Sequence, residues 1–307
     1  MNPSEVQSAA HPARAAADAP HAQPKPTKPV VSVRGLFKAI DGQPILNGVD
    51  LDVYAGEVLV ILGDSGSGKS TLLRHMIGSL SPDQGSVCLF GDDLSALSQA
   101  ELEETRKKIG VLFQSGALFS SKTIRDNVAL PLREHTALSA EVINAIVKVK
   151  LEMVGLREHA NKLPAELSGG MQKRAGFARA IALDPQILFC DEPSAGLDPI
   201  RSSEMDRLIR TVCESLGAAC VVVTHEMDSA FAIADRLAML DMGRLAAVEE
   251  RDWFDRLRNL SDTDAEALNR KDKIIRQFLR GDLTGPLSAR RDLASYERDL
   301  LGDQDQS

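Results

Sequence analysis

Residues 63–70 have the side-chain types and the spacing that a phosphate-binding loop requires. Their sequence is Gly-Asp-Ser-Gly-Ser-Gly-Lys-Ser, with an apolar run before it and an apolar-periodic segment after it. Glycines let backbone N–H groups turn inward around an anion, a lysine adds a point charge, and a serine hydroxyl suits Mg²⁺. A chance glycine-rich turn would not need this context. The residues predicted to contact a bound nucleotide are Gly63, Ser65, Gly66, Ser67, Gly68, Lys69, Ser70 and Thr71.

Two adjacent carboxylates close an apolar run far downstream of this loop. Residues 187–190 are Ile-Leu-Phe-Cys, and Asp191 and Glu192 follow directly. A strand here would carry Asp191 to the edge of a sheet, where it could bind Mg²⁺, and Glu192 could orient or deprotonate a water. A lone Asp-Glu pair is more often a solvated loop end, but its order after a phosphate loop favours a catalytic site.

A second candidate anion site lies at Ser168, Gly169 and Gly170. Ser-Gly-Gly at the start of a helix presents N–H groups and a hydroxyl to an anion. One chain with one phosphate loop has no evident need for a second such site. The need arises if two chains sandwich a nucleotide, so the sequence predicts a two-fold symmetric dimer. For the tripeptide alone, the start of an ordinary helix remains the alternative.

The elements that would position these residues alternate between strands and helices. Strands that are apolar throughout suit a parallel sheet covered on both faces, and polar residues at their carboxyl ends are where α/β folds bind ligands. Helical spacing is expected at residues 71–80 and 139–159, and in a helix that starts just after Ser168 and stops before Asp184-Pro185. Order is expected to begin near Val31, with strands at residues 45–53, 58–62, 87–90, 109–113, 187–190 and 220–223.

Charge and hydropathy limit the functional classes that fit the chain. The 307 residues carry a formal net charge of −8, which disfavours a protein that coats nucleic acid. No apolar run approaches the roughly 20 residues of a membrane-spanning helix. The N-terminal residues lack the apolar centre of a secretion signal. We therefore expect a cytosolic protein that acts at a membrane only through partners.

Residues 30–249 resemble the ATP-binding subunits of ABC transporters, which implies ATP and Mg²⁺ as ligands and ATP hydrolysis as the activity. The resemblance implies an α/β fold of the P-loop NTPase, ABC type: a RecA-like core, an antiparallel β subdomain and a helical subdomain. Residues 1–29 are expected to form a disordered tail, and residues 250–307 a charged, mainly helical C-terminal extension.

The resemblance also implies functions for individual residues. Gln114 matches a glutamine that contacts Mg²⁺ and the attacking water, Asp198 an aspartate that crosses the dimer interface, and His225 a histidine at the γ-phosphate. The implied catalytic residues are Glu192, His225 and Gln114. The implied metal ligands are Ser70, Gln114 and Asp191, and a second chain adds Ser168, Gly169 and Gly170 to the nucleotide site.

The chain departs from the family at the base of the nucleotide. The family usually stacks adenine on an aromatic residue shortly before the phosphate loop, and by spacing this position falls at Ile40. An isoleucine cannot stack in the same way, and Phe37 is the nearby aromatic alternative.

Several stretches resemble one branch of the family, the ATPases of MCE-type, or Mla, phospholipid transport systems of Gram-negative envelopes. The implied partners are a second ATPase subunit, an MCE/Mla-type integral-membrane permease, a periplasmic MCE-domain lipid-binding subunit and a small STAS-like regulatory subunit, with no nucleic acid. The implied location is the cytoplasmic face of the inner membrane, where the permease holds the protein. The stretches are residues 112–119, 126–136, 167–171, 276–281 and 285–286.

In this branch the C-terminal extension crosses to the neighbouring ATPase. The apolar stripe Ile274, Ile275, Phe278 and Leu279 is the expected contact, with a solvated charged tail as the alternative. An importer ATPase for another small solute, such as an amino acid, shares every catalytic motif and remains a second hypothesis. A non-transport ABC protein is a third, disfavoured by the single phosphate loop and the lack of a heptad run.

Overall fold

The computed structural model describes residues 28–287. Most of the predicted N-terminal tail and the charged segment 288–307 lie outside the described residues. Within the described range two sheets form. The larger has the strand order β10-β9-β3-β8-β7-β6, parallel except for the hairpin of β9 and β10. Its strands are β3 Val58–Leu62, β6 Ile109–Leu112, β7 Ile187–Asp191, β8 Ala219–Val223, β9 Arg236–Asp241 and β10 Arg244–Glu250.

The smaller sheet is antiparallel throughout, with the order β2-β1-β4-β5. It forms the antiparallel subdomain that the sequence predicted, beside the parallel core. Its strands are β1 Val31–Ile40, β2 Gln43–Val53, β4 Gln84–Leu89 and β5 Asp92–Asp93.

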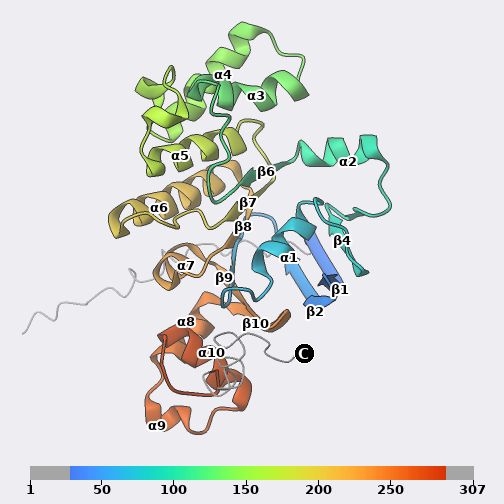
Figure 1. Ribbon diagram of the computed structural model, residues 1–307, viewed down its shortest axis with the longest axis vertical. Coiled ribbons are helices and arrows are strands. Elements are labelled where there is room, and N and C mark those ends of the chain that lie inside the picture. Colours follow the sequence, from blue (N-terminus) through green and yellow to red (C-terminus); the bar gives the residue numbers. More distant parts are fainter. Residues whose placement is uncertain (1–27, 288–307) are drawn as a thin grey trace, which may run out of the picture.

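The helices form separate groups around the sheets (Figure 1). Helices α3, α4 and α5 gather beyond the β6 edge of the large sheet, and α8 to α10 gather beyond the β10 edge. This arrangement confirms the predicted α/β class with a helical subdomain and a C-terminal helical extension. The helices are α1 Lys69–Met76, α2 Gln99–Arg106, α3 Ile124–His135, α4 Ala140–Met153, α5 Gly169–Ala180, α6 Pro199–Leu216, α7 Met227–Ile233, α8 Arg251–Asn259, α9 Asp262–Ala265 and α10 Arg270–Arg280, with 3₁₀ turns at Arg157–His159 and Pro164–Glu166.

Alternation along the central strands divides the core into two halves. On β3, Val58, Val60 and Leu62 pack with the helices α3 to α8, whereas Leu59 and Ile61 pack with the antiparallel sheet and α1. Successive side chains of a strand point to opposite faces, so a strand buried on both faces must be apolar at every position. This explains the uninterrupted apolar runs that the sequence shows.

Capping side chains and glycines with positive φ set the ends of several helices. Helix α5 starts just after Ser168, as predicted from the sequence, and the structure adds that Ser168 is its N-cap, with its side chain accepting from the Met171 N–H. Two expected helices are shorter than predicted because glycines in the left-handed region end them. Gly78 has φ +67° after α1, and Gly155 has φ +70° after α4.

The C-terminal stripe does not have the position that we expected. Ile274, Ile275 and Leu279 are buried within their own chain, where they join the core cluster that also contains Phe254 and Leu257 of α8. Their apolar surface is therefore unavailable to a neighbouring ATPase, and the prediction of an intermolecular contact is wrong for these three. No helix within residues 28–287 is both long and apolar enough to cross a membrane.

Helix α5 packs against the loop after β6 at a distance that only glycine allows. A Cβ on Gly176 would lie 2.7 Å from the Gly116 carbonyl oxygen and 2.9 Å from the Gly116 Cα. Both obstacles are backbone, so neither can rotate away. Overpacking of this kind usually destabilises a fold, so this contact generates the first prediction.

Gly176→Ala is expected to lower the free energy of unfolding by about 1–3 kcal/mol, because the helix must move off the loop. Denaturant unfolding of the purified protein measures this. Gly169→Ala is the matched control, since the same change in the same helix meets no atom within 4 Å. Equal stability of the two variants would contradict the prediction.

Candidate active site

The phosphate loop at residues 63–68 connects β3 to α1 and is held tightly between other strands. A Cβ on Gly63 would lie 2.2 Å from the Leu240 carbonyl oxygen of β9. A Cβ on Gly68, where φ is +103°, would lie 2.9 Å from the Ile45 carbonyl oxygen of β2. The two glycines are therefore required by packing as well as by backbone conformation.

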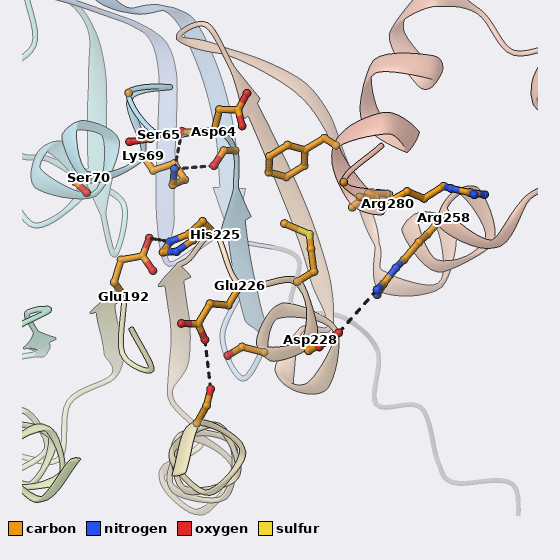
Figure 2. A pocket seen from close by; sticks show the side chains of 18 of the residues that line it. Asp64, Ser65, Lys69, Ser70, Glu192, His225, Glu226, Asp228, Arg258 and Arg280 are labelled. Carbon is orange, nitrogen blue, oxygen red and sulfur yellow. Dashed lines mark hydrogen bonds and ion pairs between the residues drawn. The ribbon is translucent and has the colours of Figure 1, made fainter. Parts of the chain in front are cut away.

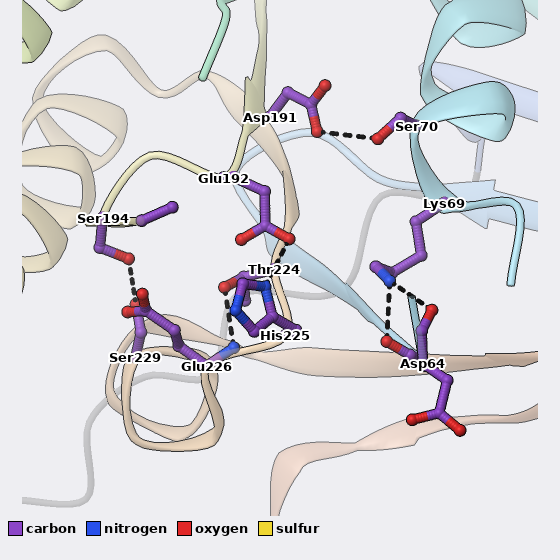
Figure 3. A network of polar contacts seen from close by, with 12 residues as sticks. Asp64, Lys69, Ser70, Asp191, Glu192, Ser194, Thr224, His225, Glu226 and Ser229 are labelled. Atoms are coloured by element: carbon purple, nitrogen blue, oxygen red, sulfur yellow. Dashed lines mark hydrogen bonds and ion pairs between the residues drawn. The ribbon is translucent and has the colours of Figure 1, made fainter. Parts of the chain in front are cut away.

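Lys69, the first residue of α1, points back into this loop (Figure 3). Its Nζ donates to the Gly63 carbonyl at 2.7 Å and to the Asp64 carbonyl at 2.8 Å. The side chain is buried, which lowers the pKa of the ammonium, while the nearby carboxylates of Glu192, Asp64 and Asp191 oppose this shift. The ammonium lines the cavity described below, within reach of an anion bound in the loop.

Ser70 and Asp191 meet across the site from α1 and β7. The Ser70 hydroxyl donates to Asp191 Oδ1 at 3.2 Å, and burial raises the pKa of the Asp191 carboxyl. No cluster of three or more His, Cys, Asp or Glu within residues 28–287 could hold a metal alone. One hydroxyl and one carboxylate fit Mg²⁺, which usually completes its shell with water and substrate phosphates.

Glu192 and His225 form the centre of the polar network in Figure 3. The 2.8 Å contact joins His225 Nδ1 to Glu192 Oε1, and because a carboxylate only accepts, Nδ1 carries the proton. Glu192 Oε2 is buried and has no hydrogen-bond partner within the described part of the chain. The Glu192 side chain is 13% exposed and lines the cavity, which leaves Oε2 as an acceptor for a water.

One large cavity of about 1650 Å³ brings most of these residues together, and its lining includes Gly63, Gly68, Lys69, Ser70, Glu192 and His225 but not Asp191. Gln114 lines it from the loop after β6, and α7 and the end of α10 form the opposite side. Arg258 and Arg280 of the C-terminal extension also line the cavity, and Figure 2 shows Arg258 directed toward Asp228, 3.8 Å away. The extension therefore contributes to the cavity that the phosphate loop lines, which sequence reasoning did not predict.

Ser168, Gly169, Gly170 and Asp198 are not brought to this cavity. A Cβ on Gly170 would contact Leu197 and the side chain of Arg201 instead, at the start of α6. Asp198 is the N-cap of α6 and accepts from the Arg201 N–H. Ser168, Gly169 and Asp198 are exposed outside the cavity, whereas Gly170 is buried. Their contact with nucleotide from a second chain remains a prediction.

Neither sequence candidate for the contact with the base borders the cavity. Neither Ile40 nor Phe37 lines the cavity, whereas Ile45 does, and its side chain lies beside Gly68. Ile40 pairs with Gln43 across the hairpin, so the turn at residues 41–42 places the start of β2 over the phosphate loop. Spacing alone could not show which strand of the hairpin faces the site.

A buried hydroxyl network lies behind Glu192. Ser229 donates to Asp206 Oδ1 at 2.6 Å, and the Ser229 and Ser194 hydroxyls are 3.3 Å apart. All three residues are nearly or fully buried. Burial raises the pKa of the Asp206 carboxyl, although the hydrogen bond from Ser229 opposes the shift. The network joins α6 and α7 to the turn that follows Glu192.

A parallel sheet with a phosphate loop, a strand-end Asp-Glu pair and a histidine at the neighbouring strand define a P-loop ATPase of the ABC type. A family model described as ABC transporter matches residues 46–195. The chain is 42% identical over 257 residues to the probable ribonucleotide transport ATP-binding protein mkl of Mycobacterium leprae, covering 84% of this chain and 70% of that protein.

It is 41% identical over 273 residues to the intermembrane phospholipid transport system ATP-binding protein MlaF of Escherichia coli, covering 89% of this chain and 96% of that protein. Among solved structures, the ATP-binding cassette MJ0796, a dimer in a post-hydrolysis state bound to ADP and Pi, is similar with a TM-score of 0.67. That match has 32% identity and covers 72% of this chain and 98% of that one. The chain therefore belongs to the ABC transporter ATP-binding proteins, and it is an ATPase of this family.

Asp206→Asn is expected to stabilise the fold increasingly as pH rises from about 4 to about 8. The folded-state pKa of Asp206 is raised, so the stability that its protonated form contributes is present below the unfolded pKa. That stability is lost as pH rises through the folded pKa. Asparagine does not ionise, and its Oδ1 can still accept from Ser229. Melting temperatures of variant and wild type across this range measure the difference.

Asp262→Asn is the matched control with the opposite sign. A hydrogen bond from Arg276 lowers the pKa of Asp262, so its ionised form contributes stability above the unfolded pKa. The variant is expected to lose stability relative to wild type towards neutral pH. A pH-independent effect of Asp206→Asn would contradict the burial argument.

Proposed function

We propose that this chain is the ATP-hydrolysing subunit of an ABC transporter that moves phospholipid across or between the membranes of a Gram-negative envelope. The observation that carries the ATPase assignment is Glu192, with one oxygen held by His225 and the other facing the cavity beside Lys69. The similarity to the intermembrane phospholipid transport protein MlaF, which covers 89% of this chain, supports the choice of transported molecule.

In the proposed site, each group of the chain acts through the geometry described above. The Lys69 ammonium binds the β- and γ-phosphates, and the N–H groups of the glycine loop surround them. Glu192 Oε2 accepts a proton from the attacking water, and the His225 N–H holds Oε1 in place. Gln114 orients the water from the opposite side. His225 Nε2 would donate to the γ-phosphate only when both ring nitrogens carry a proton.

Ser70, Asp191 and Gln114 would hold Mg²⁺, which when bound neutralises charge on the phosphate oxygens. Two chains would form a homodimer in which Ser168, Gly169 and Gly170 of one copy meet the nucleotide on the other, with Asp198 at the interface. The dimeric state of MJ0796 supports this arrangement. Closure of the dimer would shift the permease, because only a difference in affinity between two states can do so.

The proposed partners are an integral-membrane permease, a periplasmic MCE-domain lipid-binding subunit and a small STAS-like regulatory subunit. The protein would then lie on the cytoplasmic face of the inner membrane, held there by the permease. A transporter of another solute is the second candidate, because the similarity to the probable ribonucleotide transport protein mkl is of equal strength over a shorter span.

Glu192→Gln is expected to lower kcat for ATP hydrolysis by about 10²- to 10⁴-fold, because the amide cannot take the proton. Binding of ATP should be retained, since Gln keeps the shape and the contact to His225. ATPase assays with binding of radiolabelled ATP measure both. Glu214→Gln, which removes an exposed carboxylate at the far end of α6, is the control. Full turnover in Glu192→Gln would exclude Glu192 as the base.

Purification of the native complex from membranes tests the transported molecule. The proposal predicts a permease, an MCE-domain protein and phospholipid in mass spectra of the purified complex. A complex that instead holds a soluble solute-binding protein, or a ribonucleotide without phospholipid, would support the second candidate. Glu192→Gln, which is expected to accumulate the ATP-bound complex, should yield the same partners.

A further inference from the structure

Lys173 is a buried lysine that none of the motifs explains. It lies in α5, just over one turn after the Ser168 N-cap, and is 7% exposed. Lysine is almost never fully buried unless its charge is compensated. Burial lowers the pKa of this ammonium, whereas the carboxylates of Glu226 and Glu192 favour the charged form.

The Lys173 ammonium binds the turn that carries Glu192. Its Nζ donates to the Glu192 carbonyl at 3.1 Å and to the Ala195 carbonyl at 2.6 Å. Both acceptors belong to the backbone of residues 192–195, directly after β7. One charged group thus fixes both ends of this turn, and hydrogen bonds from charged donors are stronger than those between neutral groups.

The turn needs such support because its first residue is strained. Glu192 has φ +49°, in the left-handed region that side chains other than glycine rarely adopt. Its N–H donates to the Val223 carbonyl at 2.9 Å, so the end of β8 holds it on one side. Its carbonyl is held by Lys173 and by the Ala195 N–H. Strained conformations persist when the surroundings over-determine them, and they cluster at functional sites.

The opposite side of the same turn is also anchored. Ser194 is fully buried, and its hydroxyl is 3.3 Å from that of Ser229, which donates to Asp206. Helices α6 and α7 therefore hold the turn from one side while α5 holds it from the other through Lys173. The conformation of Glu192 depends on three helices that are distant in sequence.

We propose that Lys173 is a positioning residue that holds the turn at residues 192–195 so that the Glu192 carboxylate faces the cavity. This inference rests on the proposed function, because it takes Glu192 as the group that accepts a proton from water. Lys173 also connects the helix that starts at Ser168 to the Glu192 turn. A displacement of the first turns of α5 would reach Glu192 through this side chain.

The proposal predicts that loss of the Lys173 ammonium lowers the turnover of ATP but leaves the binding of ATP unchanged. Lys173 touches the backbone of the turn and does not line the cavity, whereas Lys69, Ser70 and the loop N–H groups do. Loss of the ammonium would let the turn relax and the Glu192 carboxylate shift. Misplacement of a catalytic group by about 1 Å can cost about 100-fold in rate. The affinity for ATP should change little.

Lys173→Met keeps the length and packing of the side chain but removes its donors. In full-length protein, kcat for ATP is expected to fall about 10- to 100-fold while KM and the binding of radiolabelled ATP stay within about twofold. Lys150→Met is the matched control, because it removes another buried lysine. Lys150 lies on α4 and pairs with Asp184, and within residues 28–287 it has no hydrogen bond or ion pair to the turn at residues 192–195. It should retain wild-type kcat and KM.

Wild-type kcat in Lys173→Met, or a rise in KM that accounts for the whole loss, would overturn the proposal. Melting temperatures show whether each variant is folded. If Lys173→Met is unfolded, Lys173→Gln, whose amide can still donate to one carbonyl, decides by the same criterion. Glu192→Gln distinguishes failure of the proposed base from failure of the proposed role of Lys173. Full turnover in Glu192→Gln rejects Glu192 as the base. An inactive Glu192→Gln together with a fully active Lys173→Met rejects only the positioning role of Lys173.

Discussion

The parallel register of β3, β8 and β7 is the constraint on which the rest of the site depends. Ile61 pairs with Val223, and Val223 pairs with Asp191, so the three strands end in one row. The phosphate loop, the segment with His225 and the segment with Glu192 therefore leave the sheet side by side. Parallel strands need long crossovers, which explains why Ser70 and Asp191, which meet here, are 121 positions apart in the sequence, and His225 and Glu192 are 33 apart.

The turn after β7 determines the direction of the Glu192 side chain, which we propose as the catalytic base. A strand end alone would leave Glu192 free to face solvent. The positive φ of Glu192 turns its carboxylate to His225 and the cavity, and backbone and side-chain contacts from β8, α5, α6 and α7 maintain that conformation. The strain is local, but the groups that offset it come from four separate elements, so packing between these elements affects the position of Glu192.

The C-terminal extension packs on its own chain and lines the cavity, whereas its sequence predicted contact with a neighbouring chain. Its apolar stripe packs on α8 and the core of its own chain, and Arg258 and Arg280 line the same cavity as the phosphate loop. An amphipathic helix buries its apolar face against whatever surface is nearest and complementary. The pattern of residues 270–280 predicted a buried face correctly, but it could not specify whether the covering surface belonged to the same chain.

The sequence by itself determined the fold class, the phosphate loop, the Asp-Glu pair at the end of β7 and the start of α5 at Ser168. Each of these follows from local chemistry: glycine conformations, an apolar strand on both faces, a serine N-cap. Only the tertiary structure decided that Ile45 rather than Ile40 lies at the loop, that α10 lines the cavity and that Lys173 holds the Glu192 turn. These depend on hairpin register and helix packing, which join residues distant in the chain and leave no periodic signal in it.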